Sequence, residues 1–419
     1  MIDTKTEVLV IGAGSIGVNS AHFLTERGFK VTLLDKDDVC SSTSWGNAGL
    51  LVPSHSLPLA SPGVISQGIR WMFDSKSPFY IKPRFNLSLW LWLWKFRTAC
   101  TAKHQREGAV VLREISEKSM ELYNSFDDLA DFEFHLERKG IIFLYATQDG
   151  YQHGTEDIKL LRDIGLEVVD MDRNQVAEKL GGVDTSAIAG TYFPGDAHLA
   201  PADFVKGLAS KAKSVGVEIK TDTQVKSFER KGKKIVAANT NHGMIYADQF
   251  VLAAGSWSPE IANTLGLNIP IQPAKGYSVS YQRPEKSLNM PVMLSEAKTA
   301  VTPMGNILRV GGTLELVGMD LSINQKRVDA LVQAAKTFFP KIEFDSLPMI
   351  KTWAGLRPTT PDGLPLVGRP KGFDNLVIAA GHSMMGISTG PGTGLLVAQE
   401  INGENHFMET EMFDPNRFN

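Results

Sequence analysis

Cysteine is nearly absent from this sequence, because its 419 residues include only Cys40 and Cys100. The two stand in neither a CxxC pair nor a Cys/His ligand spacing, which argues against a disulfide framework and against a structural zinc site. We therefore expect no bound metal. So few cysteines fit a reducing compartment, and we expect a cytoplasmic protein.

Long apolar runs and an excess of either charge are also missing. No stretch is long enough to span a bilayer, and the polar start, followed by an apolar run that Gly12 and Gly14 interrupt, predicts no signal peptide. The 43 basic and 46 acidic residues leave a net charge of −3, so nothing indicates a nucleic-acid partner. The chain shows no internal repeat and no low-complexity segment.

What is present is enough apolar sequence for two domains, since the chain is too long for one simple hydrophobic core. Near the N-terminus, residues 8–11, 18–27 and 30–35 follow one another as strand, helix and strand, which predicts a βαβ unit. From about 66 to 130 the periodicity is helical, most clearly at 110–126. This part is predicted to be a helical excursion out of the sheet.

The middle of the chain alternates between strand and helix patterns. Short runs at 140–145 and near Val168 and Tyr192 predict an antiparallel sheet in a second domain. The chain then returns to an α/β pattern. In this part we predict a helix at 201–215, a strand at 218–220, a hairpin from Val225 onward and a buried strand at 250–255.

A glycine-rich turn lies between the first strand and the first helix. Gly12, Gly14 and Gly17 form a GxGxxG pattern: the first permits the tight turn, the second lets a pyrophosphate approach, and the third lets helix pack on strand. The helix N-terminus offers free N–H groups to phosphates, and an acidic residue ends the second strand, where a carboxylate binds ribose hydroxyls. We predict an adenine dinucleotide held by these glycines with Ser15, Ile16, Asp35 and Lys36.

NAD and FAD share this fingerprint, so three further segments decide between them. Residues 41–49 are small, hydroxyl-rich and flexible enough to lie along a pyrophosphate and a flavin. The strand ending at Gly255 lets backbone pass close to a cofactor, and the glycine-dense segment 381–394 precedes a helix, so its amides can face negative charge on an isoalloxazine ring. These segments favour non-covalent FAD. The predicted contacts are Ser42, Thr43, Ser44, Asn47, Ala48, Gly49, Leu50, Val225, Ala254, Gly255, Gly386, Ile387, Ser388 and Thr389.

Motifs that occur together in one family are spread over nearly the whole chain. They lie at 12–17, 44–49, 275–278, 309–313 and 353–363, and the Gly-Leu-Arg-Pro segment followed by the Gly-His loop at 381–382 is the most specific part. The set resembles the D-amino-acid oxidase family of FAD-dependent oxidoreductases, and within it the branch of bacterial D-amino-acid dehydrogenases.

This resemblance implies an α/β fold with α+β elements. A Rossmann-like FAD-binding domain would be interleaved with a substrate domain built on a large mixed or antiparallel sheet with helices, which agrees with the alternation described above. We expect the FAD-binding domain to comprise residues 1–60, 195–270 and 350–419. The substrate domain would then comprise 61–194 and 271–349.

The resemblance also makes Arg357 the anchor for a substrate carboxylate, the alternative being an arginine with a structural role in a turn. A planar guanidinium meets a carboxylate with two parallel hydrogen bonds. Tyr277 is predicted to donate a further hydrogen bond or to close the pocket, unless it is simply a half-buried strand residue. His382 is expected beside the flavin, as a neighbour or a structural group but not as the base.

The implied reaction is oxidation of the C–N bond of a small D-amino acid by hydride transfer from Cα to the flavin, with positioning supplying much of the catalysis. Electrons would pass to a respiratory quinone, another acceptor or O2. Two alternatives stay open. One is a related enzyme acting on sarcosine, glycine or a 2-hydroxy acid, and the other is a flavin-binding subunit that is inactive without a partner.

Residues 52–56 depart from the D-amino-acid dehydrogenase pattern by an extra histidine. Ser54 and His55 are predicted to hydrogen-bond a substrate hydroxyl, which makes D-proline or cis-4-hydroxy-D-proline the specific expectation. A loop histidine without special function is the alternative.

The most apolar segment, 87–97, contains Trp90, Trp92 and Trp94 and is followed by basic residues. Tryptophan prefers the headgroup zone, so one interpretation is peripheral contact with the inner face of the cytoplasmic membrane. The other is a packed helix, because apolar residues on all sides of a helix usually mean burial.

Overall fold

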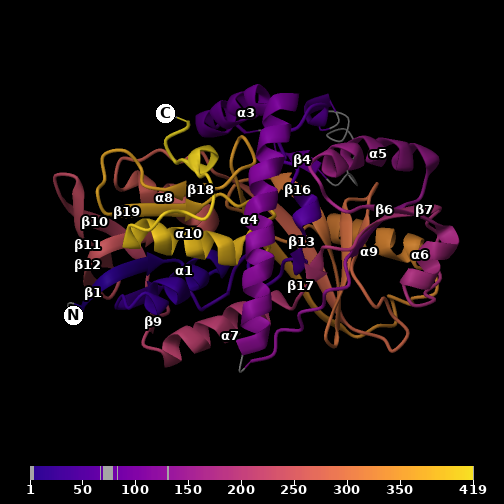
Figure 1. Cartoon of the computed structure of the whole chain (residues 1–419), viewed down its shortest axis with the longest axis horizontal. Helices are drawn as coiled ribbons and strands as arrows, with labels where there is room; N and C mark the ends of the chain where they lie inside the picture. The colour runs from indigo at the N-terminus through magenta and orange to yellow at the C-terminus, as the bar shows by residue number, and fades with distance from the viewer. Residues whose placement is uncertain (1–3, 67, 69–78, 83, 130–131, 419) are drawn as a thin grey trace.

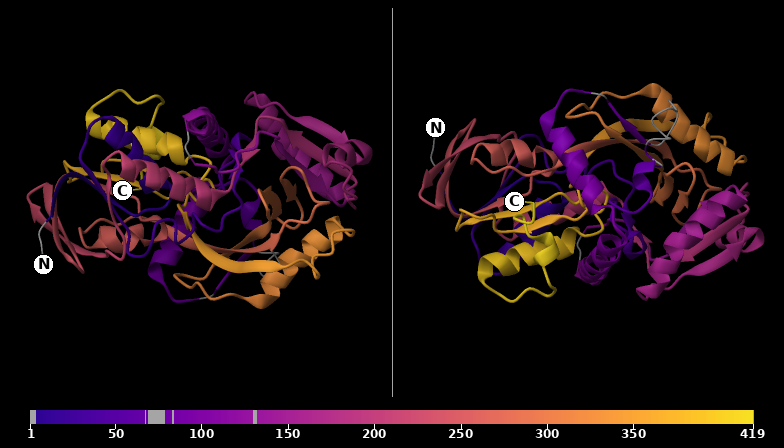
Figure 2. Two further views of the ribbon diagram at one scale, coloured as in Figure 1. Left: turned by 90° about the horizontal axis from the view of Figure 1, so that it is seen from below. Right: turned by 90° about the horizontal axis from the view of Figure 1, so that it is seen from above.

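The computed structural model describes residues 4–66, 68, 79–82, 84–129 and 132–418. Two β-sheets lie at opposite ends of the long axis, and the long helix α4 (Ala102–Leu129) crosses the molecule between them (Figure 1). The two sheets are also separate in the views from below and from above (Figure 2). The mixed α/β class expected from the sequence is confirmed.

The first sheet is built on the predicted βαβ unit, formed by β1 (Thr4–Ile11), α1 (Ser15–Glu26) and β2 (Val31–Leu34). The helix begins at Ser15, earlier than its apolar periodicity indicated. β1 pairs in parallel with β2 and with β12 (Gly243–Leu252). Alternate residues of β1 enter two different apolar clusters, one on each face of the sheet, as expected for a covered parallel sheet.

The strand order of this sheet is β10-β11-β12-β1-β2-β9, with β19 beside β12 and β18 beside β19. The strands near Val225 form the predicted hairpin. The other strands are β9 (Glu218–Lys220), β10 (Val225–Lys231), β11 (Lys234–Thr240), β18 (Leu366–Gly368) and β19 (Leu376–Ala380).

Helices cover both sides of the first sheet. α1, α7 (Pro201–Ser214) and α10 (Gly390–Asn402) pack together on one face, and α8 (Ser258–Asn263) lies against the other. α4 packs across α10, where Gly392 is required because a Cβ there would lie 2.8 Å from Ser119 Oγ. The long helix therefore fixes the C-terminal helix to the rest of the molecule.

Within the described residues, the second sheet has nine strands, ordered β17-β13-β16-β15-β14-β5-β7-β6, with β4 beside β16. Most neighbours are antiparallel, but β14 pairs with β5 and β16 with β4 in parallel, so the sheet is mixed. Helices α5 (Gln148–Asp163), α6 (Arg173–Lys179) and α9 (Gln325–Phe338) pack on it. The strands are β4 (Phe79–Ile81), β5 (Ile141–Tyr145), β6 (Val169–Asp172), β7 (Ala189–Phe193), β13 (Gln272–Gln282), β14 (Val292–Leu294), β15 (Thr299–Met304), β16 (Ile307–Leu316) and β17 (Met349–Thr359).

Two parts of the chain pack across the expected division into domains. Most of β17 was assigned to the FAD-binding domain, but this strand pairs with β13 in the second sheet. Helix α4 was assigned to the substrate domain, but it packs against α10 in the apolar cluster of the first sheet. The stretch 66–130 is not helical throughout, because β4 lies within it. Parts of that stretch, at 67, 69–78, 83 and 130, lie outside the described residues, as do residues 1–3 of the expected polar start.

The tryptophan-rich segment forms helix α3 (Leu87–Ala99), and only one face of this helix is buried. Leu89, Trp92 and Phe96 are buried, whereas Trp90 and Trp94 are 60% and 64% exposed. The expectation that an all-apolar helix is buried all round is therefore wrong here, because α3 lies at the surface and only one of its faces meets the protein. None of the helices in the described residues is long and apolar enough to cross a membrane.

Candidate functional site

A cavity of about 1450 Å³ lies where the two sheets meet. The glycine turn, the 41–49 loop, the ends of β13 and β17, and the Gly381 loop all contribute to its wall. Typical small-molecule sites measure about 300–1,000 Å³. This space therefore suits a large cofactor together with a small substrate.

The glycine turn has the close contacts that its motif requires. Gly12 has a φ of +108°, and a Cβ on it would lie 2.6 Å from the Ala253 carbonyl oxygen; a Cβ on Gly17 would lie 1.8 Å from the Gly12 carbonyl oxygen. Next to this turn, Asp35 accepts a hydrogen bond from the Ala13 N–H at 2.7 Å, and burial raises the pKa of its carboxyl. The acid is thus held at the end of β2, where a ribose would lie.

The 41–49 loop is fixed by side chains from the second sheet. Arg309 on β16 donates to the carbonyls of Trp45 and Asn47 at 3.2 and 2.8 Å, and Ser278 on β13 donates to the Gly46 carbonyl at 2.8 Å. Burial lowers the pKa of Arg309 to about 10. Sequence reasoning assigned no role to Arg309, although an arginine among the apolar residues of a strand was a signal that it meets a buried polar group.

Most residues predicted to contact the cofactor line this one cavity. They are Gly12, Gly14, Ser15, Ile16, Asp35, Lys36, Ser42, Thr43, Ser44, Asn47, Ala48, Gly49, Leu50, Val225, Ala254, Gly255, Gly386 and Ile387. Gly17, Ser388 and Thr389 lie behind the wall. Gly17 serves the packing of α1, Ser388 Oγ accepts from the Val52 N–H at 2.9 Å, and Thr389 donates to the Met385 carbonyl at 2.8 Å.

The polar groups of this wall fit a dinucleotide. The Ser15 N–H at the start of α1 donates to Ser44 Oγ at 2.9 Å, and the buried Ser15 hydroxyl has no hydrogen-bond partner within the described part of the chain. Gly14 has no side chain to cover these groups; a Cβ built on it would lie 3.2 Å from Ser44 Oγ. An unpartnered hydroxyl at the N-terminus of a helix suits a pyrophosphate.

Arg357 reaches the cavity from β17. Its guanidinium donates to the Thr313 carbonyl at 2.6 Å and, more weakly, to the Gly312 carbonyl at 3.5 Å, and no acidic side chain pairs with it among the residues that the structure describes. Gly276 opposite makes the necessary room, because a Cβ there would lie 2.3 Å from Arg357 Nη1. Burial lowers the Arg357 pKa to about 10, so the group stays cationic at neutral pH and favours an anion.

Tyr277 on β13 lines the same cavity, but its hydroxyl is already engaged. It donates a short hydrogen bond to Glu315 on β16, and burial together with that carboxylate raises the Tyr277 pKa well above its usual range. Glu315 in turn pairs with Arg327 on α9 at 2.6 Å. A hydrogen bond from Tyr277 to a substrate would therefore require its hydroxyl to leave Glu315, whereas its ring closes the pocket wall as it stands.

His382, predicted beside the flavin, and His55, predicted to meet the substrate, both line the cavity. His382 shares a hydrogen bond of 3.0 Å with Thr393 Oγ1, and burial lowers its pKa to about 3. His55 lies on the short helix η1 (Pro53–His55); burial, and then the charge of Lys298, lower its pKa to about 4. Both rings are neutral at neutral pH, so they offer hydrogen bonds and no positive charge.

Ser54 precedes His55 and is tied to a buried acid that the sequence analysis did not consider. Its N–H donates to Asp196 Oδ1 at 3.1 Å, and its hydroxyl donates a short hydrogen bond to Asp196 Oδ2. Asp196 immediately precedes β8 (Ala197–His198), which pairs with β3 (Leu50–Leu51) just before η1. The pairing of these two short strands brings the acid and the serine together from distant parts of the chain.

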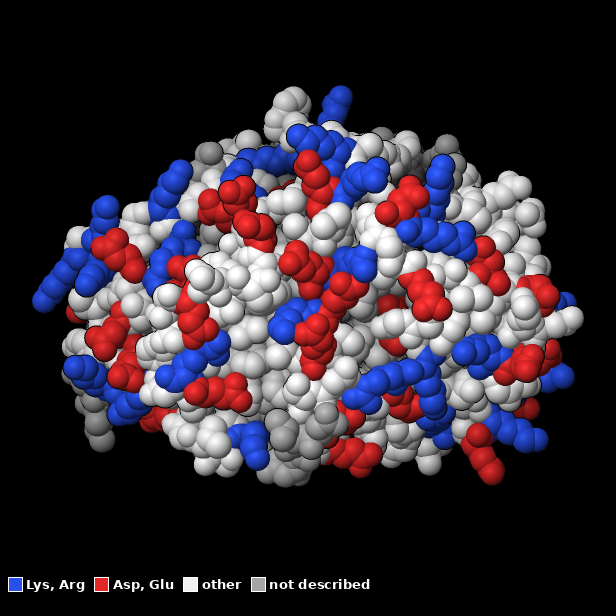
Figure 3. Space-filling view, in the orientation of Figure 1, with Lys and Arg blue, Asp and Glu red and all other residues white. Residues whose placement is uncertain are grey.

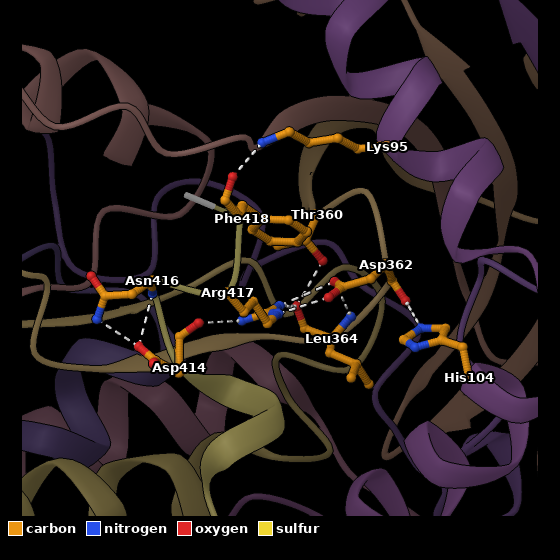
Figure 4. Close-up of polar contacts among 9 residues, drawn as sticks. All are labelled: Lys95, His104, Thr360, Asp362, Leu364, Asp414, Asn416, Arg417 and Phe418. Atoms are coloured by element: carbon orange, nitrogen blue, oxygen red, sulfur yellow. Dashed lines mark hydrogen bonds and ion pairs between the residues drawn. The ribbon is translucent and has the colours of Figure 1, made fainter.

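The C-terminus holds the segment that follows β17 (Figure 4). Arg417 donates to both oxygens of Asp362, at 2.7 and 3.0 Å. His104 on α4 hydrogen-bonds the Asp362 carbonyl at 2.8 Å, and Lys95 on α3 donates to the carbonyl of Phe418 at 2.7 Å. Two helices and the C-terminal residues thus brace the end of β17, from which Arg357 projects.

A Rossmann-like sheet whose glycine turn opens into a large cavity, covered by a second mixed sheet, defines a class: the two-domain dinucleotide-binding oxidoreductases. Residues 7–400 match the model of the DAO family, described as FAD dependent oxidoreductase. The chain belongs to this family and is an FAD-dependent oxidoreductase.

Named relatives and solved structures agree with this assignment. The chain is 34% identical to the D-amino acid dehydrogenase of Granulibacter bethesdensis, with 95% of this chain and 96% of that one covered. It is 32% identical to the D-amino acid dehydrogenase of Neisseria meningitidis serogroup C, with 98% and 99% covered. Its fold is similar to glycine oxidase from Geobacillus kaustophilus (TM-score 0.80, 23% identity, 99% of each chain) and to L-proline dehydrogenase from P. horikoshii (TM-score 0.76, 23% identity, 100% and 98%).

Proposed function

We propose that this protein oxidises the C–N bond of a small D-amino acid, specifically D-proline or cis-4-hydroxy-D-proline. The observation that carries the proposal is the Arg357 guanidinium, a cation in the cavity wall that donates, among the described residues, only to backbone carbonyls. A carboxylate can accept two parallel hydrogen bonds from such a group. The D-amino acid dehydrogenases to which the chain is similar support the class of substrate.

The protein's part in this reaction is mainly to bind and orient. Arg357 fixes the substrate carboxylate, and a fixed carboxylate limits the directions in which Cα–H can point. The glycine turn and the 41–49 loop would hold FAD, which would supply the hydride acceptor. Phe143 and Met385 make part of the cavity wall apolar, and such a wall would limit water beside a substrate bound there.

The preference for a proline-type substrate rests on the wall formed by η1. Ser54 and His55 line the cavity, and no side chain hydrogen-bonds the His55 ring nitrogens among the residues described. A neutral imidazole can both donate and accept a hydrogen bond. It would therefore suit the hydroxyl of cis-4-hydroxy-D-proline.

The experiment is to reduce the bound flavin with candidate substrates in the absence of O2. D-proline or cis-4-hydroxy-D-proline is expected to bleach the 450 nm absorbance, and the L-isomers are not. Bleaching only by sarcosine, glycine or 2-hydroxy acids would refute the D-amino acid assignment, and no bleaching at all would favour a subunit that needs a partner. O2 or a soluble quinone is then added to the bleached protein. The electron acceptor is identified as the one that restores the yellow colour.

We also propose that the exposed face of α3 rests on the inner face of the cytoplasmic membrane, where a respiratory quinone would accept the electrons. Trp90 and Trp94 are exposed on this face, with Leu87 and Leu91 beside them. Basic side chains (blue) lie along the upper edge in Figure 3, where α3 and the start of α4 lie in Figure 1. Tryptophan with lysine and arginine is the composition that anionic membrane surfaces attract. The stretch 79–106 contains no acidic residue, and its basic residues are Lys82, Arg84, Lys95, Arg97, Lys103 and Arg106.

Replacing Trp90 and Trp94 together with serine is expected to lower cosedimentation with phosphatidylglycerol vesicles at least about tenfold, since burying one large apolar side chain is worth roughly 1.5–3 kcal/mol. Met349 and Ile350 supply the control, because they are 63% and 54% exposed on β17. Their serine variant should sediment like wild type. Equal losses in both variants, or no binding by wild type, would contradict a membrane role for α3.

A further inference from the structure

The Ser54–Asp196 pair is a polar feature of the cavity wall that substrate binding alone does not explain. Asp196 is 2% exposed, and both of its carboxylate oxygens accept hydrogen bonds from one residue, Ser54. No cation forms an ion pair with it in the part of the chain that the structure describes. Burying a carboxylate without a cation costs folding free energy. The position of Asp196 behind Ser54 in the cavity wall therefore indicates a functional role.

We propose that Asp196 accepts, through the Ser54 hydroxyl, the proton that the substrate ammonium group must lose before oxidation. This inference rests on the proposed function. An amino acid binds as the ammonium form, whereas hydride can leave Cα only when the nitrogen lone pair is free. The substrate N–H bond breaks as its proton passes to Ser54 Oγ, and the Ser54 proton passes to Asp196 Oδ2. The substrate is left as the neutral amine, and Asp196 is left as the neutral acid.

The hydrogen-bond direction suits this transfer. Ser54 Oγ already donates to Asp196 Oδ2, so its lone pairs are free to accept from a group in the cavity. The Ser54 N–H, bonded to Oδ1, fixes the serine and the acid relative to each other. When hydride leaves the neutral amine, the product becomes a positively charged iminium, and the proton on Asp196 passes by the same route to water once the product has gone.

The basicities of the neighbouring groups favour Asp196 over the histidines. Burial raises the Asp196 pKa to about 7, an effect that the hydrogen bonds from Ser54 only partly offset. The pKa values of His55 and His382 are lowered to about 4 and about 3. Near neutral pH a base with a pKa close to the working pH is the most effective, so the imidazoles are weaker acceptors than the carboxylate.

Other titratable groups lie on the elements around Asp196. They are His55 on η1, His198 on β8, Tyr192 on β7, and Glu137 and Lys139 on the segment that bridges to β8. Burial lowers the pKa of His198 to about 4, so it is neutral in the working range. Glu137 and Lys139 pair with each other at the surface, which leaves Asp196 as the group expected to set the lower limb of the pH profile.

Asp196→Asn tests the transfer, because an asparagine keeps the shape while it accepts no proton. Its amide oxygen can accept from the Ser54 N–H, and its amide nitrogen can donate to Ser54 Oγ. Flavin reduction in the FAD-bound enzyme is followed without O2 from pH 6 to 10. In wild type, the second-order rate constant should fall below about pH 7, because the carboxylate must be ionised to accept a proton. In the variant the rate constant should be about 10²-fold lower at pH 7. It should then rise about tenfold per pH unit as the free substrate ammonium loses its proton, so that the two enzymes converge near pH 9.

Ser54→Ala should show the same convergence at high pH, since it removes the relay hydroxyl. Ser56→Ala is the matched control. Ser56 is a buried serine of the same turn that donates to the Pro53 carbonyl and does not line the cavity. Its pH profile should follow that of wild type.

Two outcomes would count against this role, and they are distinguishable. If Asp196→Asn and Ser54→Ala lower the rate equally at every pH, the pair is merely structural and the proton route is refuted, although the proposed oxidation stands. If no amino acid reduces the wild-type flavin at any pH, the proposed function fails and the proton route fails with it.

Discussion

Replacing Arg357 by leucine is expected to lower kcat/KM for the amino acid roughly 10²- to 10⁴-fold, while the purified protein stays yellow. Two hydrogen bonds to a charged partner are worth roughly 3–6 kcal/mol together, and every 1.36 kcal/mol is about tenfold in rate. FAD should be retained, because the glycine turn and the 41–49 loop do not depend on this guanidinium. Arg357→Lys should recover only part of the loss, since an ammonium cannot form the two parallel bonds.

Arg283 offers a matched control for that experiment. It too donates to two backbone carbonyls, those of Gly305 and Leu288, at 3.2 and 2.8 Å, but it does not line the cavity. Arg283→Leu should therefore leave KM unchanged, whatever it does to the unfolding temperature. Unaltered saturation kinetics in Arg357→Leu would show that the substrate carboxylate is bound elsewhere.

Gly12→Ala is expected to yield a protein with FAD affinity weakened on the order of 10²-fold or more. The new Cβ would meet the Ala253 carbonyl oxygen at 2.6 Å, at a φ of +108°, and left-handed strain plus overpacking cost about 2–5 kcal/mol. The backbone that must shift carries Ala254 and Gly255, which line the cavity. The ratio of absorbance at 450 and 280 nm and equilibrium dialysis with FAD measure the loss.

Gly28→Ala separates the clash from the strain. Gly28 lies just after the same helix α1 with a φ of +84°, but nothing lies within 4 Å of a Cβ built there. This variant should lose roughly 1–2 kcal/mol of stability and keep its FAD. Equal FAD affinity in the two variants would mean that the close approach at Gly12 does not shape the cofactor site.

The local elements were predictable where one periodicity dominates. Residues 8–35 alternate between buried strand and helix patterns, and helix α7 and the hairpin after Val225 follow similar patterns. β4 was not predictable, because three residues give too short a pattern, and its pairing with β16 comes from a distant part of the chain. The outer face of α3 was misjudged for a related reason, since sequence reports that a helix is apolar but not whether anything covers it.

In the candidate site, sequence patterns identified several residues whose side chains or backbone suit cofactor and substrate binding. The glycine turn, Arg357 and His382 were singled out because each stands in a recognisable motif, and His55 because it departs from one. Asp196 stands in no motif. It becomes important only because β8 pairs with β3 and brings the carboxylate against Ser54. In the same way, Arg309 has a role only because β16 passes beneath the 41–49 loop.

The sequence by itself determined the class of this protein, because the GxGxxG turn and the Gly-Leu-Arg-Pro segment are local patterns whose chemistry is carried by adjacent residues. The tertiary structure alone decided which polar groups are free to act. It engages the Tyr277 hydroxyl with Glu315. Among the described residues, it leaves the Arg357 guanidinium without an acidic partner and buries Asp196 without a cation. Those states depend on burial and on partners far along the chain. Folding sets them, because hydrogen bonds and desolvation act between groups that are near in space, whatever their separation in sequence.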